Sequence, residues 1–179
     1  MTGRVVLRLL LVIVAVVVVQ DSVIVHLRVF GAHPEIVWLL PLTAGLLGGP
    51  ELGAVVGFFG GLALDCLLPT PFGLTAFVAT LIGFGVGTVA ERSGLAAEGG
   101  VWWLLPGLGG AASMFGVLAY AAFGIVFGED QFSGVNYLAI IPVVMLFGAA
   151  FAVPLWMLTA WAIGDQRGAR RNRSAETNW

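Results

Sequence analysis

Residues 48–73, GGPELGAVVGFFGGLALDCLLPTPFG, decide how the chain is organised. They contain an apolar run over residues 52–68, bounded by Gly48-Gly49-Pro50-Glu51 on one side and by Pro69 and Pro71 on the other. A helix in lipid cannot cross such breakers without leaving backbone polar groups unpaired, because proline lacks an N–H and interrupts the helix. The stretch therefore predicts one apolar helix with a defined start and a defined end.

The whole chain shares the apolar character of this stretch. Of its 179 residues, 59% are hydrophobic and 10% are charged, and the mean hydropathy is +1.01. An ordinary soluble domain has roughly 25% charged residues. This composition excludes a water-soluble monomer and indicates a polytopic protein whose surface faces the lipid bilayer.

The charged residues exclude several other classes of protein. All eight basic residues are arginines and the formal net charge is −2, so the chain lacks the broad cationic surface that binds nucleic acid. One cysteine and two histidines cannot supply the four ligands of a structural zinc site. We therefore expect no nucleic-acid partner, no metal and no cofactor.

Six apolar runs are candidates for membrane-spanning helices. They cover residues 5–25, 36–49, 52–68, 72–90, 101–127 and 137–163. Arg4 precedes the first run and Arg8 lies near its start, as in a signal peptide, but the run is longer than the usual apolar region of a signal and no cleavage site follows, which favours a retained helix. Residues 36–49 are short for a span, so they form a short span with a tight turn, part of a long kinked segment, or a re-entrant arm.

The arginines distinguish a chain with six spans from one with five, because cytoplasmic loops carry an excess of basic residues. With six spans, seven of the eight arginines lie on the cytoplasmic side and only Arg28 lies outside. Those seven are Arg4, Arg8, Arg92, Arg167, Arg170, Arg171 and Arg173. The sequence thus predicts an all-α integral membrane protein, a compact six-helix bundle over residues 1–165 with both termini in the cytoplasm. Residues 166–179 should form an arginine-rich tail that is disordered or lies on the membrane surface.

Glycines repeat every four residues in the third run. Gly53, Gly57 and Gly61 follow this spacing, and Gly60 stands beside the last of them. Glycines at this spacing share a helix face and let a second helix approach closely, which is how helices associate in lipid. The second helix belongs either to the same bundle or to a partner chain.

Asp65 follows the glycines and is the one acidic residue embedded in an apolar run rather than in a loop. A carboxyl group at membrane depth costs about 2.5–3.5 kcal/mol at the bilayer centre, so it needs a reason to be there. Asp65 serves as a polar anchor for the following loop, as a contact for a partner or ligand, or as part of a proton relay. The prolines at 69 and 71 place it near the outer membrane surface, which favours the anchor.

Catalysis and coupled transport are not indicated. The fourth to sixth runs contain no second acidic or basic residue, as a proton or ion pathway would require, and the chain lacks the phosphate-binding motif of an ATPase. His26 and His33 flank a short outer connection without a nucleophile in a recognisable setting. Trp38, Trp102 and Trp103 stand at run ends, where tryptophan usually marks the membrane surface. We expect a protein without enzymatic activity.

An ordered set of these features resembles the rod shape-determining protein MreD family. It consists of Pro34-Glu35-Ile36, an apolar stretch to Gly49, Gly53-x-x-x-Gly57-Phe58-x-x-Gly61-Leu62-x-x-Asp65, and Pro71-x-Gly73-Leu74. The match covers residues 34–90, about a third of the chain, and the other runs are similar in hydropathy alone. Because Gly60 precedes Gly61, the register of the family's second glycine is open by one residue.

The resemblance implies a component of the cell-elongation machinery in the bacterial plasma membrane. It implies MreC as the direct partner, with MreB, a SEDS glycosyltransferase and a class B penicillin-binding protein in the same peptidoglycan-synthesis complex. It implies no enzymatic activity, and roles in folding or partner packing for Gly53, Gly57, Gly61, Asp65 and Gly73. It also implies a fold similar to the substrate-binding subunits of energy-coupling-factor vitamin transporters.

Such a vitamin-binding subunit is therefore the alternative function. It would line a cavity with several polar groups that fix its ligand. The inner runs offer few such side chains: Thr43, Thr75, Thr80, Ser113 and Thr159. The sequence thus favours a membrane scaffold that holds a single-span partner near the second and third runs.

Overall fold

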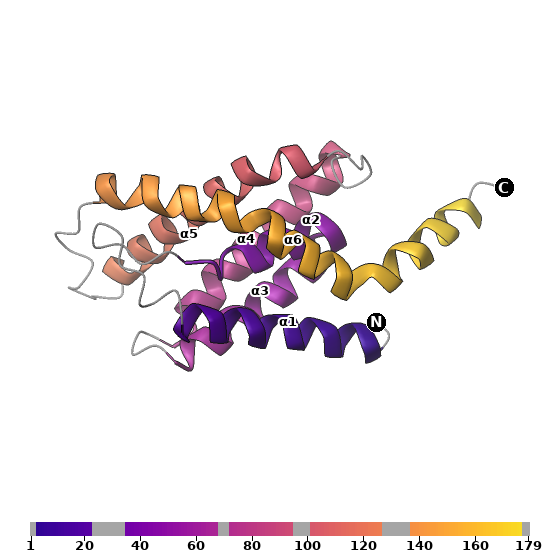
Figure 1. Cartoon of the computed structure of the whole chain (residues 1–179), viewed down its shortest axis with the longest axis horizontal. Coiled ribbons are helices and arrows are strands. Elements are labelled where there is room, and N and C mark those ends of the chain that lie inside the picture. Colours follow the sequence, from indigo (N-terminus) through magenta and orange to yellow (C-terminus); the bar gives the residue numbers. More distant parts are fainter. Residues whose placement is uncertain (1–2, 23–34, 68–71, 95–100, 127–136, 177–179) are drawn as a thin grey trace.

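The computed structural model describes residues 3–22, 35–67, 72–94, 101–126 and 137–176, and within these ranges it contains helices and no strand. Figure 1 shows the helices packed side by side as a bundle. Their bounds are α1 Gly3–Ser22, α2 Leu39–Gly48, α3 Pro50–Asp65, α4 Leu74–Ser93, the 3-10 turn η2 Val101–Trp103, α5 Leu105–Val126 and α6 Tyr137–Glu176.

Four segments are long and apolar enough to cross a membrane: α1, α4, α5 and residues Ile140–Gly164 of α6. The remaining two helices are shorter, with 10 residues in α2 and 16 in α3. At 1.5 Å per residue they measure about 15 and 24 Å, against a hydrocarbon core of about 30 Å. The all-helical class is confirmed, and four of the six expected spans are long and apolar enough for a full crossing.

The short helix α2 lies at the centre of the bundle. Every residue from Leu39 to Leu46 is buried, and the helix contacts α3, α4, α5 and α6. A helix that is apolar on all sides belongs in a protein interior rather than on its surface. The length of α2 is therefore compatible with membrane depth, because the surrounding helices shield its ends.

Gly49 and Pro50 reverse the chain between α2 and α3. Gly49 has φ 84°, a conformation that side chains rarely adopt, and its N–H donates to the carbonyl oxygen of Gly45. Pro50 then occupies the first turn of α3, where its missing N–H costs nothing. The predicted breaker is thus a tight turn between two helices.

Two sequence predictions need correction in this fold. The tail over residues 166–179 was expected to be disordered or to lie on the membrane surface, but as far as Glu176 it is helical, because α6 continues to that residue. Figure 1 shows its yellow end projecting beyond the bundle. Arginine, alanine and glutamine are good helix formers, which explains the continuation. Trp38 was expected at the membrane surface, yet it is fully buried.

The burial of Trp38 has a local cause in α5. Gly116 has no side chain, and a Cβ atom there would lie 2.5 Å from Cδ2 of the Trp38 ring. The indole thus fills the space that Gly116 leaves, with Tyr120 beside it at a ring-centroid distance of 6.2 Å. By contrast, Trp102 and Trp103 are exposed, at 66% and 65%, as expected for residues at a membrane surface.

Candidate functional site

The glycines of α3 face α4, and we call this contact the α3–α4 seam. A Cβ atom at Gly53, Gly57 or Gly61 would come within 3.0 Å of the α4 backbone. The contacting pairs are Pro50 with Gly87, Gly53 with Gly83, Gly57 with Ala79 and Gly61 with Ala76. Each step forward along α3 is matched by a step back along α4, so the helices are antiparallel and touch backbone to backbone. Because α4 fills this face, the three glycines serve packing within the chain.

Gly60 lies outside the seam. A Cβ atom there would meet one side-chain atom, Cδ1 of Leu40 in α2, at 3.4 Å, which is an ordinary contact. Gly61, and not Gly60, therefore continues the series of Gly53 and Gly57 along the seam.

Gly83 and Gly87 supply the α4 side of the seam. A Cβ atom at Gly83 would strike the Gly53 carbonyl, and one at Gly87 would strike Pro50. Gly45 of α2 meets the same part of α4, since its Cβ would lie 2.7 Å from the Gly83 oxygen. Gly85, which lies between them in the sequence, has no atom within 4 Å of its Cβ position and takes no part in the seam.

Asp65 closes the seam at its other end. Its Oδ2 accepts hydrogen bonds from the backbone N–H groups of Gly73 at 3.0 Å and Ala76 at 3.1 Å, and its Oδ1 accepts one from Thr75 at 3.2 Å. The side chain is 3% exposed. The first N–H groups of a helix have no partner within that helix, so a residue of α3 caps α4. An anchor, a partner contact and a proton relay were considered for Asp65, and these hydrogen bonds correspond to the anchor.

Gly73 makes this cap possible through its backbone. It has φ 96° and ψ −8°, in the left-handed region, and it directly precedes α4. A Cβ atom would meet nothing within 4 Å, so the requirement for glycine comes from the dihedral angle. The resemblance residues Gly53, Gly57, Gly61, Asp65 and Gly73 thus form one unit, the α3–α4 hairpin.

Two polar contacts that the sequence did not suggest join α1 to the bundle. Gln20 accepts a hydrogen bond at Oε1 from the backbone N–H of Ile36, at 2.9 Å. The guanidinium of Arg8 lies 5.0 Å from the ring centre of Trp161 in α6, a cation–π contact. A signal for both was present, because Arg8 and Gln20 are polar residues in an otherwise apolar helix.

Buried hydroxyl groups join α2 to α6. The Oγ1 atoms of Thr43 and Thr159 are 2.9 Å apart, and each also reaches a carbonyl one turn back on its own helix, Leu39 and Leu155 respectively. Interhelical hydrogen bonds of this kind add about 0.6 kcal/mol on average in membrane proteins. These two threonines are thus occupied by each other and by the backbone.

Glu35 and Trp38 form a second polar group just before α2. Loss of water around the carboxyl raises the pKa of Glu35 from 4.5 to about 7. The Glu35 side chain is nevertheless partly exposed, and the Trp38 Nε1 has no acceptor within hydrogen-bonding geometry. His26 and His33, which neighbour Glu35 in sequence, lie outside the described residues.

In the part of the chain that the structure describes, no three side chains among His, Cys, Asp and Glu converge on a point that could hold a metal ion. Thr75 and Ser113 have buried hydroxyl oxygens without a partner, and Thr80 donates to the carbonyl of Ala76. No protein-family model, curated protein or solved structure matches the chain.

Proposed function

We propose that the chain is a non-catalytic membrane scaffold of the bacterial cell-elongation complex, a protein of the MreD type that binds MreC. In this proposal all six helices traverse the membrane and both termini are cytoplasmic. MreB, a SEDS glycosyltransferase and a class B penicillin-binding protein act in the same complex.

One observation carries the proposal. The residues that resemble the MreD family between Gly53 and Gly73 belong to one hairpin, in which the Asp65 carboxyl group binds three N–H groups at the start of α4. The two helices of this hairpin touch backbone to backbone along the seam, and the close contact leaves no gap between them. A closely packed unit of this kind suits a protein that positions partners.

The polar groups favour a scaffold over a vitamin-binding subunit. Thr43 and Thr159 bond to each other, and Asp65 is used as a helix cap. A transport subunit of that class would direct such groups into a ligand cavity. The partner must bind outside the seam, since α4 already occupies the glycine face.

Co-purification tests the proposal. The tagged full-length chain is extracted in mild detergent from its native membrane, and the retained proteins are identified by mass spectrometry. We expect MreC, together with cell-wall synthases, at a level that Gly60→Ala leaves unchanged. Recovery of ATP-binding-cassette subunits, or a tightly bound vitamin, would replace the scaffold with the transport function.

A further inference from the structure

A cleft separates α4 from α5 on the outside of the bundle. It has a volume of about 280 Å³, its floor is Leu42 of α2, and its walls include Leu81, Gly85, Leu108, Ala111 and Phe115. All of its lining residues are apolar. The helices α4 and α5 contact each other far less than α3 contacts α4, which leaves room for the cleft between them.

Small residues keep this α4–α5 cleft open. A Cβ atom at Gly85 would meet nothing within 4 Å, whereas one at Gly83 or Gly87 would strike a neighbouring backbone. Ala111 on the opposite wall is also exposed. The cleft can therefore be filled by substitution without disturbing the packing of the bundle.

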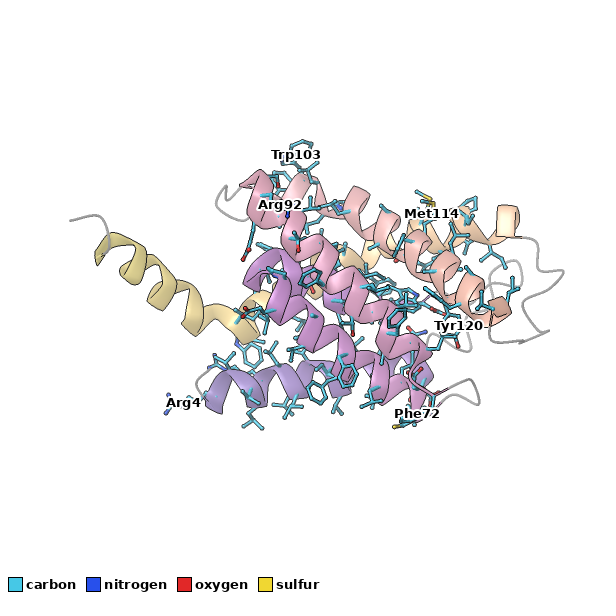
Figure 2. All side chains as sticks on the ribbon, turned by 180° about the vertical axis from the view of Figure 1, so that it is seen from behind. Arg4, Phe72, Arg92, Trp103, Met114 and Tyr120 are labelled. Carbon is cyan, nitrogen blue, oxygen red and sulfur yellow. The ribbon has the colours of Figure 1, made fainter. Side chains whose placement is uncertain are left out.

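A cation lies at one end of the cleft. Arg92 is exposed and stands seven residues after Gly85, which returns it to nearly the same helix face, about 10 Å further along α4. Within the described residues no carboxyl group pairs with it. Trp102 and Trp103 are exposed near the start of α5, and Figure 2 shows Arg92 and Trp103 at the same end of the bundle.

The spacing along α4 matches one leaflet of a bilayer. From Leu81 in the cleft to Arg92 is eleven residues, or about 16 Å of helix. Half of a hydrocarbon core of about 30 Å is about 15 Å. An amphiphile with its polar group at Arg92 would therefore place its apolar chain along the full length of the cleft.

The size of the cleft favours an acyl chain over a protein helix. A helix with its side chains is about 10–12 Å across. The cleft lies between two helices that contact each other, and its volume of about 280 Å³ suits a slender chain. We propose that the α4–α5 cleft binds one acyl chain of an anionic phospholipid whose phosphate is held by Arg92.

Native mass spectrometry of the purified full-length chain tests the proposal. Phosphatidylglycerol and phosphatidylcholine with identical acyl chains are titrated separately, and the dissociation constant of the first bound lipid is measured. We expect phosphatidylglycerol to bind about fivefold more tightly, and Arg92→Gln to remove this preference. Glu91→Gln, at the exposed neighbouring position, should keep it.

Filling the cleft tests the position of the acyl chain. Gly85→Leu from α4 and Ala111→Leu from α5 should each weaken binding of both lipids about tenfold. Gly107→Leu is the control, because Gly107 is an exposed glycine of α5 with open space at its Cβ position and no part in the cleft.

Equal affinity for the two lipids would overturn the proposal. So would unchanged lipid binding by either filling variant in a protein that elutes as a single species. Loss of a co-purified protein without loss of lipid would assign the cleft to a protein partner instead.

Discussion

Asp65, the last residue of α3, accepts a hydrogen bond at Oδ2 from the backbone N–H of Ala76 in the first turn of α4, at 3.1 Å. Ala76 is also the residue whose backbone Gly61 packs against. The hydrogen bond of Asp65 and the close packing of Gly61 thus meet at the same residue of α4.

Replacement of Asp65 by alanine should destabilise the protein. The change removes the acceptor of the backbone N–H groups of Gly73, Thr75 and Ala76. These groups surround a buried side chain, since Asp65 is only 3% exposed. Buried unpaired groups cost about 1–3 kcal/mol each, and water admitted to the gap offsets part of this, so we expect a loss of about 3 kcal/mol. Denaturation in detergent, followed by circular dichroism, measures it. Cys66→Ala, at the exposed next residue, is the control, and equal stability of the two variants would contradict the cap.

Replacement by alanine should affect stability differently at the neighbouring positions Gly61 and Gly60. Gly61→Ala forces a Cβ atom to 2.5 Å from the Ala76 Cα, and such overpacking costs about 1–3 kcal/mol. Gly60→Ala meets only Leu40 at 3.4 Å and should be neutral, or more stable by up to about 1 kcal/mol because alanine favours helix. Thermal unfolding of both variants in the same detergent gives the comparison. Similar losses at the two positions would mean that the seam is wrongly placed.

The α3 sequence predicts a close helix contact at its glycines, but by itself it does not identify the helix that makes this contact. The four-residue spacing of Gly53, Gly57 and Gly61 predicts a close helix contact, because glycine exposes the backbone wherever it stands. It does not say which helix makes the contact. Gly83 and Gly87 are spaced by four as well, and the antiparallel match of the two series is the signal that identifies α4.

Burial and helix length were harder to predict. Trp38 stands at the end of an apolar run, where most tryptophans mark the membrane surface, and its burial depends on Gly116, which lies 78 residues later in the chain. The continuation of α6 to Glu176 was missed because polar composition says where a chain leaves lipid, not where its helix ends. Local sequence patterns predict the helices, whereas burial in the core depends on contacts between residues that are distant in the sequence.

The stability of the protein should fall as pH rises through the range set by Glu35. The pKa of Glu35 is raised from 4.5 to about 7, so the folded state holds this proton more tightly than the unfolded chain. The contribution is complete below pH 4.5 and is lost as the pH approaches and passes 7. We expect the free energy of unfolding to fall by about 1–2 kcal/mol over this range. This is less than the full pKa shift implies, because the Glu35 side chain is partly exposed.

Glu35→Gln should remove this pH dependence. The variant should equal or exceed the wild type in stability at pH 8, and unfolding measured from pH 5 to 8 gives the profile. Glu51→Gln, at an exposed position in α3, should keep the wild-type slope. An unchanged slope in Glu35→Gln would assign the pH dependence to other groups.

Labelling of cysteine should establish that α4 crosses the membrane. Cys66 is exposed just after α3, at the end of the hairpin where α4 begins, and Ser93 is exposed at the opposite end of α4. With both termini cytoplasmic, a membrane-impermeant maleimide should label Cys66 in intact spheroplasts. Ser93→Cys, in a chain with Cys66→Ser, should be labelled only after the membrane is opened. Labelling of both positions from one side would contradict the six-span arrangement.

The proposed role in bacterial cell elongation is tested most directly by depletion of the chain in its native cells, with cell width and length measured by microscopy. We predict that rods become round as the protein is lost, and that rod shape returns with the wild type and with Gly60→Ala. Asp65→Ala should restore it poorly, because the α3–α4 hairpin no longer holds its geometry. Cells that remain rods of normal width after depletion would contradict the proposed function.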